Sequence, residues 1–139
     1  RWVGGMLTNV TTTNAQIKKL RDLERRMLNG DLEKRYNKLE VQRYQEEIDS
    51  LNVKYSGIKE LSGKPGAVIV IDTLVDANAI REANNLHIPV VGVVDTNADP
   101  SAVSYAIPGN DDAIKGTQLL LDYFVAAVRE AGVAKKEAA

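Results

Sequence analysis

The chain of 139 residues contains no cysteine and only one histidine. The absence of cysteine excludes a disulfide scaffold, a cysteine-based zinc site and a thiol nucleophile. The single histidine, His87, leaves no multi-histidine metal cluster and no histidine dyad. No run of hydrophobic residues is longer than six, at 123–128, whereas a membrane-spanning helix needs about 20. The sequence therefore predicts no membrane span and no membrane partner.

Charge is divided unevenly along the chain, although the net charge is only -1. Residues 1–62 hold 12 basic and 9 acidic side chains, a net charge of +3, while residues 63–139 hold 6 basic and 10 acidic ones, a net charge of -4. Basic residues crowd together between Lys18 and Arg26. This split favours a half that faces a polyanion and a half that serves as a scaffold, with a solvated helix face as the plain alternative.

Two amphipathic helical patterns occupy residues 14–61. The first follows a possible N-cap at Asn14 and repeats apolar residues on one face. The second steps by three and four residues, as a coiled-coil seam does, and because a seam needs a partner we expect an antiparallel α-helical coiled-coil hairpin. Residues 1–13 are expected to form a non-periodic N-terminal loop. The second pattern consists of Val41, Tyr44, Ile48, Leu51, Tyr55 and Ile58.

A linker at residues 62–66, which contains glycine and proline, separates the hairpin from a segment of different character. Strand-like apolar runs then alternate with helical patterns, which predicts an α/β body with a parallel sheet over residues 62–131. Three strands and two covering helices make a thin sheet, so further strands are expected ahead of Arg1. Residues 132–139 are expected to form a flexible tail. The predicted strands are 67–72, 89–95 and 105–108, and the predicted helices are 76–86 and 111–131.

Three carboxylates, Asp72, Asp95 and Asp99, lie at or just beyond predicted strand ends. Together they are candidates for Mg²⁺ in a phosphoryl-transfer domain, because open α/β sheets place ligands at the carboxyl ends of strands. The interpretation we favour is that each aspartate caps its own turn. The aspartates of segment 109–112 would repel phosphate, and no phosphate-binding glycine motif is present. We therefore expect no catalytic residue, no metal, no cofactor and no small-molecule substrate.

The N-terminal loop combines residue types that suit RNA. Arg1 and Trp2 can stack on a base or a sugar, while Thr8 and Asn9 can donate to phosphates. Trp2 alone is more typical of a core anchor, but the basic helix face that follows adds weight to RNA binding. The predicted RNA-binding residues are Arg1, Trp2, Thr8, Asn9, Lys18, Lys19, Arg21, Arg25 and Arg26.

Several segments carry a further signal through their order along the chain. The sequence begins with Arg-Trp-Val-Gly-Gly-Met-Leu-Thr-Asn and continues with distinctive stretches up to about residue 130. In this order they resemble the bacterial-type small-subunit ribosomal protein two family, and the stretches 94–100 and 107–114 are the most specific. The stretches are 57–59, 70–73, 82–91, 94–100 and 107–114.

The resemblance implies a partial flavodoxin-like α/β body with an inserted coiled-coil hairpin, because the family's first strands and helices, ahead of the Arg-Trp segment, are absent here. It implies a non-enzymatic structural constituent of the small ribosomal subunit that binds ribosomal RNA and contacts neighbouring small-subunit ribosomal proteins through its body. A cytoplasmic, ribosome-bound location follows, with an organellar ribosome left open. Two alternatives remain: the Mg²⁺-dependent phosphoryl-transfer domain and a free-standing coiled-coil interaction module.

Overall fold

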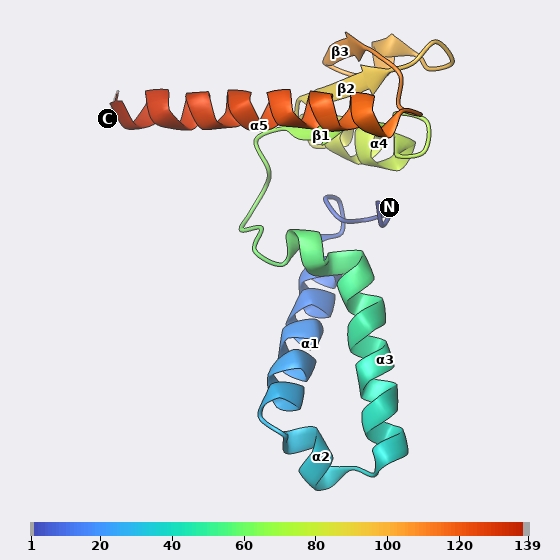
Figure 1. Ribbon diagram of the computed structural model, residues 1–139, viewed down its shortest axis with the longest axis vertical. Coiled ribbons are helices and arrows are strands. Elements are labelled where there is room, and N and C mark those ends of the chain that lie inside the picture. The colour runs from blue at the N-terminus through green and yellow to red at the C-terminus, as the bar shows by residue number, and fades with distance from the viewer. Residues whose placement is uncertain (1, 138–139) are drawn as a thin grey trace. The chain divides into compact units, whose positions relative to one another are not determined.

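The computed structural model describes residues 2–137, with side chains up to residue 132. Over that range the chain is mixed α/β, with a three-stranded parallel sheet and five α-helices (Figure 1). It divides into two compact units. We call Arg1–Gly66 with Arg81–Ile88 the hairpin unit, and Ala67–Ile80 with Pro89–Ala139 the sheet unit. None of the described helices is both long and apolar enough to cross a lipid bilayer.

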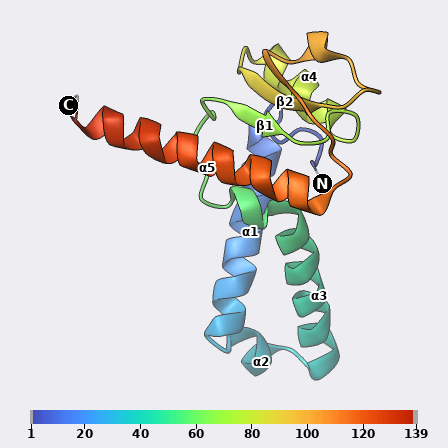
Figure 2. The ribbon, with the colours of Figure 1, turned by 45° about the horizontal axis from the view of Figure 1, so that its top comes forward.

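The hairpin unit is built on the helices α1 (Val10–Leu28), α2 (Asp31–Arg35) and α3 (Lys38–Tyr55). Helices α1 and α3 run antiparallel and side by side, and the short α2 joins them at the tip (Figure 1 and Figure 2). The turn into α2 is made by Gly30 at a φ of 70°, a left-handed conformation that glycine adopts without steric cost. Glycine is therefore the residue that lets the chain reverse here.

An apolar seam holds α1 against α3. Leu20 and Leu23 of α1 pack with Ile48 and Leu51 of α3, and all four side chains are buried. Met27, Tyr44 and Tyr55 pack against this cluster. The α3 members lie at the spacing read from the sequence, whereas Val53, which falls outside that spacing, is 86% exposed. Burial on one helix face and exposure on the other are what an amphipathic helix requires.

Helix α1 begins at Val10, four residues before the expected start at Asn14. This corrects the expectation that residues 10–13 belong to a non-periodic loop. Although β-branched residues are weak helix formers, Thr13 is buried and its hydroxyl donates to the carbonyl of Gly5 at 3.2 Å. A tertiary contact of this kind outweighs the small propensity penalty of a threonine run.

The sheet unit contains a parallel sheet in the order β1-β2-β3. The central strand is the most buried, with Val90 and Val93 almost fully removed from solvent. β-Branched side chains suit such a strand because they pack well on a pleated surface. The strands are β1 (Val68–Val70), β2 (Val90–Val94) and β3 (Tyr105–Pro108), helix α4 (Ala77–Asn85) lies between β1 and β2 in the chain, and α5 (Ile114–Glu137) follows β3.

Helix α5 continues beyond the end expected for it. Its backbone is helical through Glu137, six residues beyond the end at residue 131 that the sequence pattern predicted, while residues 138–139 lie outside the described residues. Much of its apolar surface is exposed, for example at Tyr123 and Val128. A hollow of about 420 Å³ between β1 and α5 is lined almost entirely by apolar side chains.

Truncating a seam residue should destabilise the protein strongly. We expect Ile48→Ala to cost about 2–4 kcal/mol of unfolding free energy, because it leaves a cavity between α1 and α3. Val53→Ala, on the same helix but exposed, should cost less than about 0.5 kcal/mol. Urea denaturation followed by circular dichroism measures both, and equal costs would contradict the observed packing.

Gly92 on β2 is sterically confined. A Cβ added there would lie 2.7 Å from Cγ1 of Val103 and 3.1 Å from Cγ2 of Thr73. Gly92→Ala should therefore cost about 1–3 kcal/mol through overpacking. Gly116→Ala on α5 is the matched control, because its Cβ would meet nothing closer than 3.8 Å. That change should stabilise the chain by about 0.5–1 kcal/mol through helix propensity, so thermal unfolding should move in opposite directions for the two variants.

Candidate nucleic-acid interface

A buried carboxylate on α4 holds the N-terminal segment of the hairpin unit. Glu82 is only 8% exposed. Its Oε1 accepts hydrogen bonds from the indole of Trp2 at 3.2 Å and from the amide of Gly5 at 2.6 Å. Its Oε2 accepts from the amides of Leu7 at 2.9 Å and Thr8 at 3.2 Å, and from the Thr8 hydroxyl at 3.2 Å. One carboxylate thus accepts hydrogen bonds from five donors in residues 2–8, the non-helical N-terminal segment that precedes α1.

Two opposing effects act on the pKa of Glu82. Burial raises it, because desolvation disfavours a charged group, whereas the hydrogen bonds from the segment favour the ionised form and lower it. The hydrogen bonds prevail, so the pKa of Glu82 lies below its ordinary value. An ionised carboxylate is an acceptor only, which suits a site where every neighbouring group is a donor.

This contact gives two of the predicted RNA-binding residues a structural role. The indole N–H of Trp2 and the hydroxyl of Thr8 both donate to Glu82, so these two residues anchor the segment. Asn9 precedes α1, is exposed, and makes no capping bond with its side chain. Arg1 lies outside the described residues. Sequence reasoning missed Glu82, because nothing local links it to donors more than 70 positions away.

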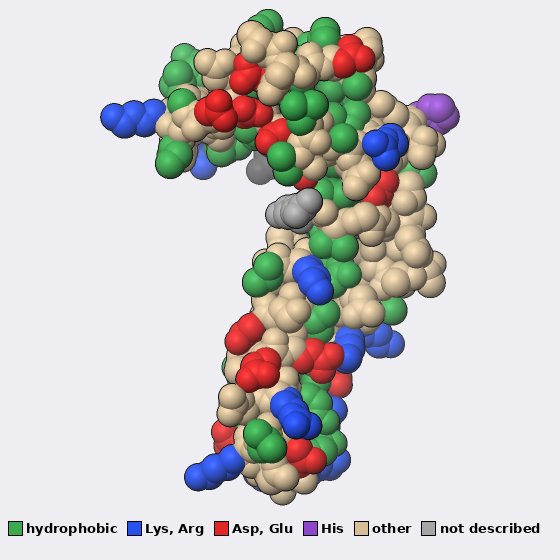
Figure 3. Space-filling view, turned by 90° about the vertical axis from the view of Figure 1, so that its right-hand side faces the viewer, with side chains coloured by type: hydrophobic (Ala, Val, Ile, Leu, Met, Phe, Trp, Pro, Cys, Tyr) green, Lys and Arg blue, Asp and Glu red, His purple; other side chains and the backbone are tan. Residues whose placement is uncertain are grey.

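The basic residues predicted on α1 are largely engaged with acidic partners. Lys19 pairs with Glu47 of α3, and Arg21 contacts Glu60 at 3.2 Å. Arg25 and Arg26 both reach Asp22 on their own helix. Lys18 is exposed and forms no ion pair with any residue that the structure describes. Figure 3 shows the result on one face, where acidic and basic side chains are intermixed along the hairpin.

These ion pairs are surface contacts. The side chains of Lys19, Arg21 and Arg25 are each at least half exposed in their pairs. Exposed pairs contribute only about 0–1 kcal/mol, because water and salt screen them. A phosphate can therefore replace the carboxylate at small cost, and the pairing does not remove these cations from an RNA-binding role.

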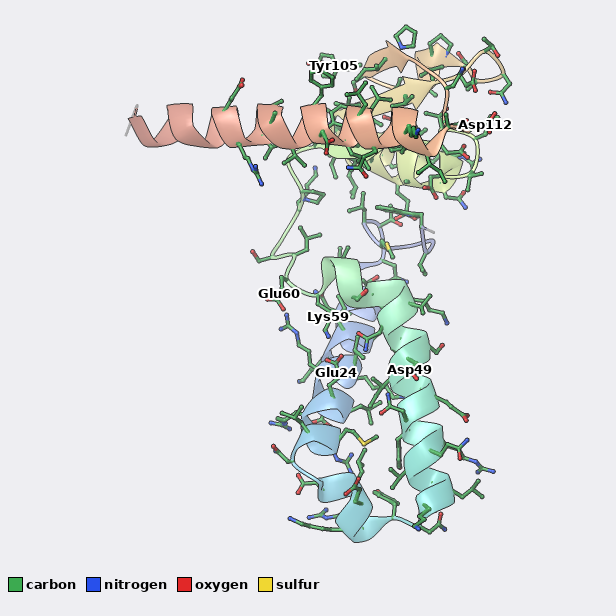
Figure 4. The ribbon with its side chains drawn as sticks, in the orientation of Figure 1. Glu24, Asp49, Lys59, Glu60, Tyr105 and Asp112 are labelled. Carbon is green, nitrogen blue, oxygen red and sulfur yellow. The ribbon has the colours of Figure 1, made fainter. Side chains whose placement is uncertain are left out.

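A more sheltered polar cluster lies toward the base of the hairpin, where Figure 4 labels Glu24 and Lys59. The Lys59 ammonium donates to both carboxylate oxygens of Glu24, at 2.7 and 2.8 Å, and Asn52 donates to Oε1 at 3.0 Å. The bond from Lys59 is the largest cause of a lowered pKa for Glu24, followed by the bond from Asn52. The cluster links α1, α3 and the segment after α3, and the sequence did not single it out.

An aromatic pair braces the tip of the hairpin. The rings of Tyr36 and Tyr44 meet edge to face with centroids 5.2 Å apart. A hydrogen bond from Tyr44, and then one from Arg26, lowers the pKa of Tyr36.

The strand-end aspartates of the sheet unit each bind their own turn. Oδ1 of Asp72 accepts from the amides of Leu74 at 3.0 Å and Val75 at 2.8 Å. Asp95 accepts from the amide of Thr96, and Asp99 from the amide of Ser101. These local bonds are the turn-capping geometry that we favoured over a shared cation.

The sheet also brings together a set of carboxylates that the sequence analysis did not group. Oxygens of Asp95, Asp111 and Asp112 lie within 4.8 Å of one another. Burial, and then the charge of Asp72, raises the pKa of Asp111. Exposed acidic groups of this kind are common on protein surfaces, and the cluster by itself assigns no chemistry.

Comparison with known proteins places the chain in a family. A family model described as ribosomal protein S2 matches residues 1–131. The chain belongs to the ribosomal protein S2 family. A relative, the small ribosomal subunit protein uS2 of Actinobacillus pleuropneumoniae serotype 5b (strain L20), is 47% identical over 130 residues, which make up 94% of this chain and 54% of that protein. The chain thus spans about half the length of this curated relative.

Membership of the S2 family confirms the resemblance seen in the sequence and the prediction that the chain is not an enzyme. It also agrees with the mixed α/β fold. This membership argues against the phosphoryl-transfer alternative.

The stability supplied by Glu82 should depend on pH. Its folded-state pKa is below the ordinary 4.5, so its contribution is complete above that value and is lost as the pH falls through the lowered pKa. At neutral pH, Glu82→Gln should cost about 1–3 kcal/mol of unfolding free energy. The NH₂ group of the glutamine is a donor, so it would face N–H and O–H groups of the segment without accepting their hydrogen bonds. Urea unfolding should show this cost shrinking as the pH falls below 4.5 and on through the lowered pKa of Glu82.

The matched control for Glu82 is Glu46→Gln, an exposed glutamate on α3 that removes the same charge without the five donors. This variant should lie within about 0.5 kcal/mol of the parent at neutral pH. A cost of Glu82→Gln that stays constant over the whole range would show that its charge does not matter.

Proposed function

We propose that this chain is a structural, RNA-binding component of the small ribosomal subunit, which contacts ribosomal RNA through the basic face of α1. The observation that carries the proposal is the density of cations on this exposed helix, where Lys18, Lys19, Arg21, Arg25 and Arg26 fall within nine residues. Membership of the S2 family and the name of the uS2 relative support the ribosomal context.

The expected mode of binding is electrostatic. Lysine and arginine side chains displace counterions condensed on the RNA backbone, and this release drives association without reading base sequence. An A-form helix offers phosphates and 2′-hydroxyls to such a surface. The weak surface pairs of Lys19 and Arg25 suit this role, because they hold the side chains near the helix until phosphate replaces the acid.

The N-terminal segment would play two roles, one in positioning and one in RNA contact. Trp2 and Thr8 position the segment through Glu82, and Asn9 offers an exposed amide next to the start of α1. Arg1, which lies outside the described residues, would add a cation to the start of the chain. Direct RNA contact is therefore assigned to Arg1 and Asn9, and a positioning role to the two anchored residues.

The proposal also covers the finer architecture. We infer that α1 and α3 form a coiled-coil hairpin, which the burial of Leu20, Leu23, Ile48 and Leu51 along one seam supports. The parallel order of the three strands supports a partial flavodoxin-like body. This body, residues 62–131, would contact neighbouring small-subunit ribosomal proteins, and the working location would be a ribosome in the cytoplasm.

Removing cations from α1 should weaken RNA binding and flatten its salt dependence. We expect the double variants Lys18→Gln with Lys19→Gln, and Arg25→Gln with Arg26→Gln, each to bind small-subunit ribosomal RNA less tightly. If each side chain meets one phosphate, the slope of log affinity against log salt falls by about 0.7–0.9 per residue. Filter binding over a series of potassium chloride concentrations measures the slope.

The control removes the same charge from a different helix. Lys115→Gln with Arg129→Gln takes two cations from α5 and should leave the salt slope unchanged. Equal losses for the α1 and α5 variants would indicate a general charge effect. An unchanged slope for the α1 variants would refute the proposed interface.

A further inference from the structure

An apolar groove lies at the base of the hairpin, within the hairpin unit. It encloses about 430 Å³ between the N-terminal segment, the start of α1 and the segment that follows α3. Its apolar floor is exposed: Val10 is 50% and Leu61 is 49% exposed. The apolar lining residues include Met6, Leu7, Val10, Ile17, Ile58 and Leu61.

The groove continues into a second hollow of different chemistry. This hollow, of about 440 Å³, shares Ile17 and Leu61 with the first and extends to Lys18, Arg21 and Lys59. Passing from one hollow to the other, the lining changes from aliphatic to cationic. The two together form one amphipathic groove.

The net charge of this groove is positive. Its lining contains Lys18, Arg21, Lys59 and Lys64 against a single carboxylate, Glu60. Arg21 pairs with Glu60, and Glu24 neutralises Lys59 from outside the lining. Lys64 donates to the carbonyl of Leu86, a neutral group that leaves its charge uncompensated. Lys18 and Lys64 are thus the two cations left to attract an acidic ligand.

We propose that this amphipathic groove binds an acidic peptide segment of a partner protein, with one bulky apolar side chain seated between Val10 and Leu61 and its carboxylates facing Lys18 and Lys64. The aliphatic floor favours a peptide over RNA, because single-stranded bases stack on aromatic or arginine planes and the floor carries neither. The one arginine of the lining, Arg21, lies in the cationic hollow and is paired with Glu60. No aromatic side chain lines the groove among the residues that the structure describes. Aliphatic pockets with a charged rim are typical of protein anchors.

Fluorescence anisotropy measures the binding of a defined peptide probe to the whole chain. The probe is a fluorescein-labelled peptide, Glu-Glu-Leu-Trp-Glu-Glu, and the comparison peptides replace either its two central residues with Gly-Ser or its four glutamates with lysine. The probe should bind at least about tenfold more tightly than either comparison peptide, since both the anchor and the charge are needed. Equal affinity of all three peptides, or no binding of the probe, would overturn the proposal.

Two variants locate the binding at the groove. Val10→Asp places a carboxylate on its floor, at a helix N-terminus where aspartate is tolerated, and Lys64→Glu reverses a rim charge. Each variant should bind the probe peptide at least about fivefold more weakly than the parent chain does. The matched controls are Val53→Asp on the exposed face of α3 and Lys115→Glu on α5. The affinity of both for the probe peptide should stay within about twofold of that of the parent chain. Circular dichroism establishes that every variant compared is folded.

A final arm separates a peptide site from an RNA site. An oligouridine strand is titrated against the parent chain and Val10→Asp. Oligouridine binding that is insensitive to Val10→Asp supports the peptide assignment, whereas oligouridine binding that is lost in that variant would assign the groove to RNA. The salt-slope experiment on α1 does not involve Val10 or Lys64, so a failure there and a failure here are distinguishable.

Discussion

The structure of the hairpin unit depends on one buried carboxylate. Glu82 of α4 accepts five hydrogen bonds from a segment that is otherwise loop, and so fixes where the chain enters α1. A buried charge is tolerated only when its hydrogen bonds repay desolvation, and here they lower the pKa of Glu82 despite its burial. The groove wall formed by Met6 and Leu7 and the start of the basic helix both follow from this anchor.

Charge on the hairpin is organised by depth. Near the surface, Lys19 and Arg25 form exposed pairs that water and salt screen, so these cations can be shared with phosphate. In a more sheltered position, Lys59 and Glu24 form a bidentate pair that ties the segment after α3 to α1. The same residue types therefore serve binding in one place and architecture in another.

The acidic residues of the sheet unit illustrate a different division. Asp72, Asp95 and Asp99 bond to amides one to three residues away, which are contacts that local turn chemistry supplies. Asp111 and Asp112 come close to Asp95 only because parallel strands deliver their following loops to the same edge. Proximity of like charges is thus a by-product of topology and needs no ligand to explain it.

The sequence by itself determined the elements that rest on local patterns. Period-3.6 spacing located α3 with Ile48 and Leu51 in its buried face, and β-branched runs located β2, because each pattern reflects which side of a regular backbone meets a core. The tertiary structure alone decided the start of α1 at Val10, the role of Glu82, and the amphipathic groove. Those features join residues far apart in the chain, and no local pattern encodes which distant donors a carboxylate will meet.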